Sequence, residues 1–150
     1  MTAGPVVWQE PVDDAWIDYN GHLSEPYYVL VLGHATDAVM DSVGLGAAYR
    51  EEHDASLYTV EAHVRYLDEV AARSELEVTS AVIGVTDKLL WIWHELRVDG
   101  RLCATEEVLG VHVVGRRSAP LPADVAARAR AALVDPPAEA GGRIRPLPRP

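Results

Sequence analysis

The sequence is poor in several residue types. It contains one cysteine, Cys103, no phenylalanine, and no lysine or arginine among its first 49 residues. One cysteine excludes an intrachain disulfide and a zinc site built from several cysteines. No apolar run reaches the roughly 20 residues that a membrane-spanning helix needs. The N-terminal residues lack the basic segment and apolar block of a secretory signal, so we expect a cytoplasmic protein.

The charge distribution argues against two classes of partner. The formal net charge is −10, and the first 49 residues carry seven of the 23 acidic side chains. Nucleic-acid binding depends on basic side chains that neutralise phosphates, and an anionic membrane surface attracts basic segments in the same way. We therefore expect neither a nucleic acid nor a membrane as a partner.

Hydrophobic periodicity predicts one long helix and several strands. The helix extends from Pro26 to Val43, after Ser24 as the N-cap and a turn at Asn20-Gly21, and it ends at Gly44. Apolar side chains surround its first turns, which is typical of a helix buried on most sides. Strands are expected at residues 5–9, 57–66, 74–86, 89–98 and 101–114.

These elements predict an α+β fold in one domain. Short turns at Asp87-Lys88 and Asp99-Gly100 join three of the last four strands, which indicates an antiparallel meander curled round the helix. We assign residues 1–118 to this domain, and residues 119–150 to a short helix followed by a proline-rich flexible tail. Since one helix covers only one sheet face, we expect the other face or an edge to pair with a second subunit.

Strict alternation in the strand at residues 57–66 divides its side chains between two faces. One face holds Tyr58, Val60, Ala62, Val64 and Tyr66, and the other holds Thr59, Glu61, His63 and Arg65.

One stretch carries a family resemblance. Residues 16–46, WIDYNGHLSEPYYVLVLGHATDAVMDSVGLG, place an acid, two residues, Gly and His directly before a tyrosine-containing helix. This pattern resembles the hotdog-fold acyl-CoA thioesterases of the 4-hydroxybenzoyl-CoA thioesterase type. Together with SLYTVEAHVRYLDEV at residues 56–70, it is most similar to the betainyl-CoA thioesterases of carnitine degradation. The resemblance covers residues 5–115.

The resemblance implies a hotdog fold, in which an antiparallel sheet wraps round one long central helix. It implies hydrolysis of a small acyl-CoA, such as betainyl-CoA, to a free acid and CoA. It also implies a homodimer or homotetramer. Coenzyme A would be part of the substrate, so no separate cofactor is expected.

The same resemblance implies that Asp18 is the catalytic carboxylate, either as a general base or as a nucleophile. It also implies an oxyanion site at the helix start, where the matching amide is that of Glu25. Unpaired N–H donors and the positive end of the helix dipole stabilise charge on a thioester carbonyl. On the residues alone, Asp18 could instead be a turn or capping acid. This chain has Ser24-Glu25-Pro26 where many relatives have Asn-Asn-Ala, and His34 where many have Glu.

Other residues are candidates for supporting roles. Asn20 and His22 could position Asp18, or they could simply build the turn. His34 could face the pocket from the helix. Glu61 could contribute to a pocket shared with a partner subunit, or lie on an ordinary exposed strand face. His63 shares that strand face, but two ligands make a poor zinc site, so we expect no metal.

The tryptophans suggest how a cationic acyl group could be bound. Trp91 and Trp93 alternate onto one strand face, and tryptophan rings attract quaternary ammonium groups. We expect an aromatic cage completed by Tyr27, Tyr28 or Tyr58. Packing of both tryptophans in a core or an interface is the alternative.

Two other functions stay open. A hotdog enoyl-CoA hydratase or dehydratase also uses an acid and a histidine, although the usual spacing or overhang segment is missing from this chain. A non-catalytic acyl-CoA-binding module would bind CoA esters without releasing a thiol. The intact sequence context of Asp18 favours the thioesterase.

Overall fold

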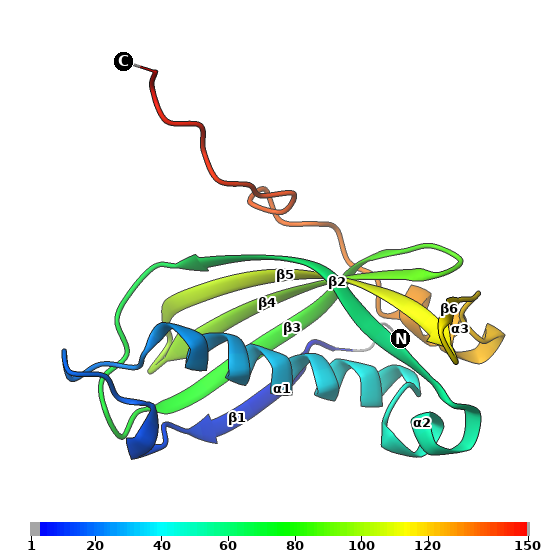
Figure 1. The fold of residues 1–150 in the computed structure, drawn as a ribbon, viewed down its shortest axis with the longest axis horizontal. Helices are drawn as coiled ribbons and strands as arrows, with labels where there is room; N and C mark the ends of the chain where they lie inside the picture. Colours follow the sequence, from blue (N-terminus) through cyan, green and yellow to red (C-terminus); the bar gives the residue numbers. More distant parts are fainter. Residues whose placement is uncertain (1–3, 150) are drawn as a thin grey trace.

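The computed structural model describes residues 4–149 (Figure 1). Residues 1–3 and 150, at the ends of the two predicted segments, lie outside the described residues. No helix in the described part of the chain is long and apolar enough to cross a membrane. In chain order the elements are β1 (Val6–Pro11), the 3-10 turn η1 (Asp14–Trp16), α1 (Glu25–Val43), α2 (Ala47–His53), β2 (Ala55–Tyr66), β3 (Glu75–Val85), β4 (Leu89–Val98), β5 (Arg101–Val114), β6 (Arg117–Ser118) and α3 (Ala123–Ala131).

Helix α1 is the central element, and its ends follow the sequence prediction. Ser24 is the N-cap, and Gly44 ends the helix in the left-handed conformation at φ 90°. Glycine adopts this conformation without the steric cost that other residues incur. The side chains of Val31, Leu32 and Ala35 are fully buried. The sheet curls round one side of the helix and buries them (Figure 1).

The strands form one antiparallel sheet in the order β1-β3-β4-β5-β2, with β6 beside β5. We call the face covered by α1 the inner face and the opposite one the outer face. The predicted meander is correct for β3, β4 and β5. It is wrong for β2, which pairs with β5 at the far edge and not with β3, because β1 occupies the free edge of β3. The connection at residues 67–74 is long enough to cross the end of the sheet.

A β-bulge in β2 changes which side chains share a face. Val60 is the extra residue, because Thr59 and Glu61 pair with consecutive residues of β5. Tyr58 therefore lies on the outer face with Glu61, and Thr59 lies on the inner face with Ala62. The predicted alternation is correct after the bulge and wrong before it, since one inserted residue reverses the faces.

A buried hydrogen-bond chain links α1 to two strands. The Thr36 hydroxyl donates to the Leu32 carbonyl at 3.0 Å, so it accepts from Nε2 of His94 at 2.9 Å. Nδ1 of His94 then accepts from the Ser80 hydroxyl at 2.6 Å. This arrangement requires a neutral imidazole protonated on Nε2. Burial of His94 lowers its pKa to about 4.

Two helices pack at the other end of α1. Helix α2 lies in a stretch to which the sequence analysis assigned no helix or strand. Helix α3 matches the predicted short helix and buries Val125, Ala126 and Ala129. After α3, the Val134 amide donates to the Val82 carbonyl at 3.0 Å. The segment following α3 therefore contacts β3 (Figure 1).

We predict that His94 makes folding sensitive to acid. Its pKa is about 4 in the folded state against 6.5 for an ordinary histidine, so the unfolded chain binds a proton that the folded chain does not. The contribution of His94 to the unfolding free energy is fully present above pH 6.5 and is lost as the pH falls toward 4. Relative to His94→Gln, the wild type should lose about 2 kcal/mol of unfolding free energy between pH 7 and pH 4.5.

Urea unfolding at the two pH values measures this difference, with the exposed His53→Gln as the matched control. If the difference in unfolding free energy between the wild type and His94→Gln stayed the same at both pH values, the prediction would be contradicted.

Candidate active site

The loop before α1 holds Asp18 in a defined turn. The Asp18 amide donates to the His22 carbonyl and the Gly21 amide donates to the Asp18 carbonyl, both at 3.0 Å. Gly21 has φ 80°, which this turn requires. Oδ1 of Asp18 accepts from the backbone N–H of Asn20 at 2.8 Å. Asn20 therefore orients the carboxylate through its backbone.

Aromatic stacking fixes this loop to the start of α1. The rings of Trp16 and Tyr27 stack with centroids 5.6 Å apart and planes 12° apart. The Ser24 amide donates to the Trp16 carbonyl at 2.9 Å, and the Leu23 amide donates to the Val70 carbonyl at 2.8 Å. These contacts hold the loop that contains half-buried Asp18 against the first turn of the helix.

The first turn of α1 has a free backbone donor. The Ser24 side chain makes no capping hydrogen bond, and Pro26 has no N–H. The Tyr27 amide donates to the Ser24 carbonyl at 3.0 Å. The Glu25 N–H has no hydrogen-bond partner among residues 4–149. A free donor at the positive end of a helix dipole is suited to stabilising an oxyanion.

Two neighbours of this loop make other contacts. Nδ1 of His22 lies 3.4 Å from a carboxylate oxygen of Glu69, so the structure pairs His22 with Glu69. The Tyr28 hydroxyl donates to the Asp68 carbonyl at 3.1 Å, and its ring meets that of Tyr66 edge to face. The role predicted for His22 in positioning Asp18 stays a prediction. Tyr28 is a buried residue that anchors the loop after β2.

A cavity of about 760 Å³ lies between α1 and the inner face of β2. We call it the inner groove. It begins at Pro26, one residue after the free Glu25 amide. Its acidic side chains are those of Asp37 and Glu106, and no lysine or arginine among residues 4–149 lines it. The lining residues are Pro26, Val29, Leu30, Gly33, His34, Thr36, Asp37, Met40, Ser56, Leu57, Thr59, Ala62, Glu106 and Val108.

Glu106 on β5 is the main groove residue that the sequence analysis missed. Its side chain is only 5% exposed, and it lies opposite His94 on the inner face. Burial raises its pKa to about 7. No residue among 4–149 hydrogen-bonds to its carboxyl group. The one sequence signal was a pair of acids, Glu106-Glu107, inside an otherwise apolar strand.

The ring of His34 is directed to β1. Its Nδ1 lies 2.6 Å from Oε1 of Glu10, and Nε1 of Trp8 donates to the same oxygen at 3.0 Å. The rings of His34 and Trp8 meet edge to face. His34 borders the inner groove by position, but its imidazole is engaged on the other side of the helix.

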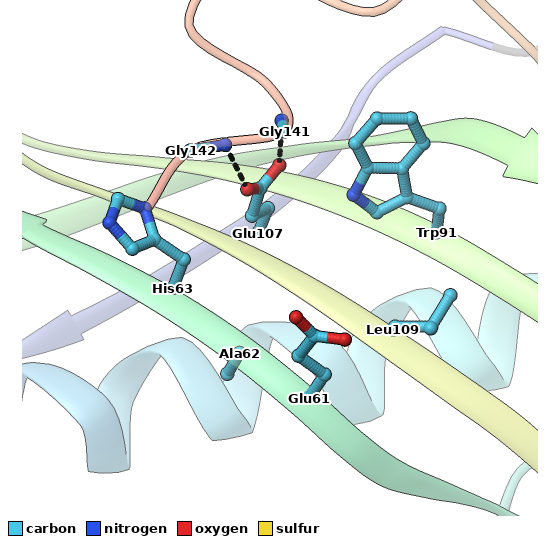
Figure 2. A pocket seen from close by; sticks show the side chains of 8 residues that line it. All are labelled: Glu61, Ala62, His63, Trp91, Glu107, Leu109, Gly141 and Gly142. Carbon is cyan, nitrogen blue, oxygen red and sulfur yellow. Dashed lines mark hydrogen bonds between the residues drawn. The ribbon is translucent and has the colours of Figure 1, made fainter. Parts of the chain in front are cut away.

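Several predicted site residues gather on the outer face (Figure 2). Glu61, His63 and Trp91 line a cavity of about 330 Å³ together with Glu107. The carboxylate of Glu107 accepts two hydrogen bonds, each at 2.7 Å, from the backbone amides of residues 141–142 (Figure 2). The C-terminal segment therefore contacts this outer pocket. Among the described residues, no group of three His, Cys, Asp or Glu is placed to hold a metal.

One chain does not form the predicted aromatic cage with Tyr27 or Tyr28. Trp91 and Trp93 alternate with Ile92 and His94, which face α1, so both tryptophans lie on the outer face. Tyr58 also lies on the outer face, whereas Tyr27 and Tyr28 belong to α1 on the inner side. The sheet separates the two groups. Alternation showed that the tryptophans share a face, but not which face the helix covers.

Glu61 is likewise separated from Asp18 within one chain. It is exposed on the outer face of β2, whereas Asp18 lies in the loop before α1. A contribution of Glu61 to a pocket shared with a second subunit stays a prediction.

We predict that Glu106→Gln stabilises the fold above neutral pH. The folded-state pKa of Glu106 is about 7 against an ordinary 4.5, so stability at this site is lost as the pH rises from 4.5 to 7. Glutamine does not ionise, so the variant does not lose stability in this pH range. Its unfolding free energy should exceed that of the wild type by about 1 to 3 kcal/mol at pH 8.

Near pH 4.5 the two proteins should be equally stable, because glutamine resembles a protonated glutamate. Urea unfolding at both pH values checks this, with the neighbouring Glu107→Gln as the control. A destabilised Glu106→Gln at pH 8 would contradict the prediction.

Comparison with known proteins identifies the family. The thioesterase-like superfamily profile matches residues 12–129. A betainyl-CoA thioesterase of Pseudomonas aeruginosa is 38% identical over 149 residues, covering 94% of each chain. An L-carnitine dehydrogenase/betainyl-CoA thioesterase of Agrobacterium fabrum is 46% identical over 103 residues, which span 68% of this chain but 21% of that longer protein.

Solved structures agree with this family. A candidate thioesterase of Pseudomonas putida is 31% identical, with a TM-score of 0.82 and 99% of each chain covered. A Staphylococcus aureus protein determined in complex with CoA has the same fold, with a TM-score of 0.88 at 23% identity and 98% of each chain covered. The chain belongs to the thioesterase-like superfamily, and it is a thioester hydrolase with the hotdog fold.

Proposed function

We propose that this thioesterase hydrolyses betainyl-CoA to betaine and CoA in the cytoplasm. The observation that carries the proposal is 38% identity over 94% of both chains with a betainyl-CoA thioesterase. The free amide at the start of α1 and the adjacent Asp18 supply the groups that thioester hydrolysis needs. No observation favours a hydratase or a non-catalytic binding module.

The turn before α1 supports a catalytic role for Asp18. Its Oδ1 is held by the Asn20 amide, whereas Oδ2 has no hydrogen bond to residues 4–149. Oδ2 can take a proton from the attacking water, or it can attack the thioester carbon directly. On either route the carbonyl oxygen gains negative charge, which the Glu25 N–H and the helix dipole stabilise. The C–S bond then breaks, and the CoA sulfur takes up a proton. On the second route, water then hydrolyses the anhydride formed with Asp18 and releases the acid.

We also propose that the protein forms a homodimer through β2. This strand is at the sheet edge, and its backbone is unpaired on one side from residue 55 to 66 within the described chain. Val60 is 57% exposed, Tyr66 44% and Leu67 44%. Long apolar edge strands aggregate unless they are paired or protected. A second copy paired at this edge would also close the inner groove, which borders β2.

We predict that Asp18→Asn abolishes hydrolysis without unfolding the protein. Asparagine keeps an oxygen that can accept from the Asn20 amide, so the turn survives, but it cannot act as a base at neutral pH. The turnover number for betainyl-CoA should fall by about 100-fold or more. Free-thiol release, followed with a chromogenic disulfide, measures the loss.

The matched control is Asp14→Asn, which makes the same chemical change at an exposed acid in η1. Acetyl-CoA and benzoyl-CoA serve as comparison substrates. Equal rates for Asp18→Asn and the wild type would remove Asp18 from the mechanism, and an inactive wild type on betainyl-CoA would reject the substrate.

We predict that a charge at the β2 edge weakens the dimer. The wild type should sediment at twice the mass of one chain at micromolar concentration. Val60→Lys should raise the dissociation constant about tenfold or more, because pairing would bury the ammonium group. Val7→Lys is the matched control, since Val7 is a 51% exposed valine on the opposite edge strand β1. A monomeric wild type in sedimentation velocity would reject the dimer.

A further inference from the structure

We propose that Glu106 binds the cationic part of the acyl group on the inner face, and that it sets the specificity for betainyl-CoA. The inference rests on the proposed function and names the residue that would distinguish a cationic from a neutral substrate. The outer-face tryptophans then have no direct role in recognising the acyl group.

Glu106 is a buried carboxylate that the fold itself does not satisfy. The neighbouring Glu107 provides the comparison, because the two side chains are 5% and 6% exposed. Glu107 accepts two backbone hydrogen bonds on the outer face. Glu106 receives none from residues 4–149, and it opens only onto the inner groove. Buried carboxylates are costly unless they are paired, and the groove beside Glu106 has room for a ligand that pairs with it.

The charge of the inner groove selects the kind of ligand. Its lining contains Glu106 and Asp37 but no lysine or arginine among residues 4–149. An anionic group placed there would be repelled, and the CoA phosphates must therefore bind elsewhere. A quaternary ammonium has no N–H to donate and is attracted only by charge and by aromatic faces. It can therefore balance the negative charge of Glu106 without donating a hydrogen bond to the carboxylate.

Tyr66 lies on β2, two residues from the residue that pairs with Glu106, and it is near Glu25. Burial raises the pKa of its phenol, and the carboxylates of Glu25 and Glu106 raise it further. Its ring centroid is 5.2 Å from that of Tyr28, and part of the ring remains exposed. An aromatic ring and a carboxylate therefore lie on the same side of the sheet as the predicted oxyanion site at Glu25.

Within one chain, the chemistry of the substrate argues against the outer pocket as the cation site. In a betainyl group a single methylene joins the carbonyl carbon to the nitrogen, so the cation and the reacting carbonyl must occupy the same site. Trp91 and Glu61 also combine an aromatic ring with a carboxylate. However, the sheet separates them from the Glu25 amide and from Asp18.

The test compares two substrates of the same shape. Betainyl-CoA carries a trimethylammonium group, and 3,3-dimethylbutyryl-CoA carries a tert-butyl group in the same place. Thiol release is measured for the wild type, Glu106→Gln and Glu107→Gln. For Glu106→Gln, kcat/KM on betainyl-CoA should fall about 10- to 100-fold. On the neutral ester it should stay within about threefold of the wild type, and Glu107→Gln should leave the preference unchanged.

Each other outcome has one meaning. Equal losses on both esters would overturn the inference, because Glu106 would then act on the reaction or on the structure and not on the cation. No loss on either ester would overturn it too, while leaving the proposed function intact. A wild type that cleaves only the neutral ester, or neither, would reject the proposed substrate, and the inference with it.

Discussion

The burial of one helix on one face of a curved sheet is the constraint on which the rest of the structure depends. Helix α1 is apolar on most sides, and the sheet covers it with β1, β3 and β4. The Thr36–His94–Ser80 hydrogen bonds fix the helix against these strands without a charge in the core. The loop before α1 packs on the first turn of the helix. The position of Asp18 therefore depends on the position of α1.

The same packing leaves one side of the helix uncovered, and that side borders the inner groove. The groove begins beside the free Glu25 amide and contains Glu106. The groove thus runs from the start of α1, where the predicted reaction groups lie, to Glu106, the proposed recognition residue. The opposite sheet face carries Trp91 and Glu61, which the fold keeps apart from this end of the helix. The inner groove, and not the tryptophan face, is the better match to a small cationic acyl group.

Features encoded by neighbouring residues could be predicted from the sequence. Ser24 and Gly44 delimit α1, and Asp99-Gly100 forms its hairpin with both residues at positive φ. The position of β2 could not be predicted, because strand order depends on long-range pairing that alternation does not record. The bulge at Val60 has no local signal either. Glu106 was missed because only the position of α1 decides which of two adjacent glutamates faces the site.

A crystal structure of the Asp18→Asn variant with betainyl-CoA bound is the most direct measurement of the central claim. The account predicts the thioester carbonyl oxygen at the Glu25 amide, residue 18 beside the carbonyl carbon, and the trimethylammonium group next to Glu106. A thioester bound on the outer face beside Trp91, or a trimethylammonium group remote from Glu106, would contradict it.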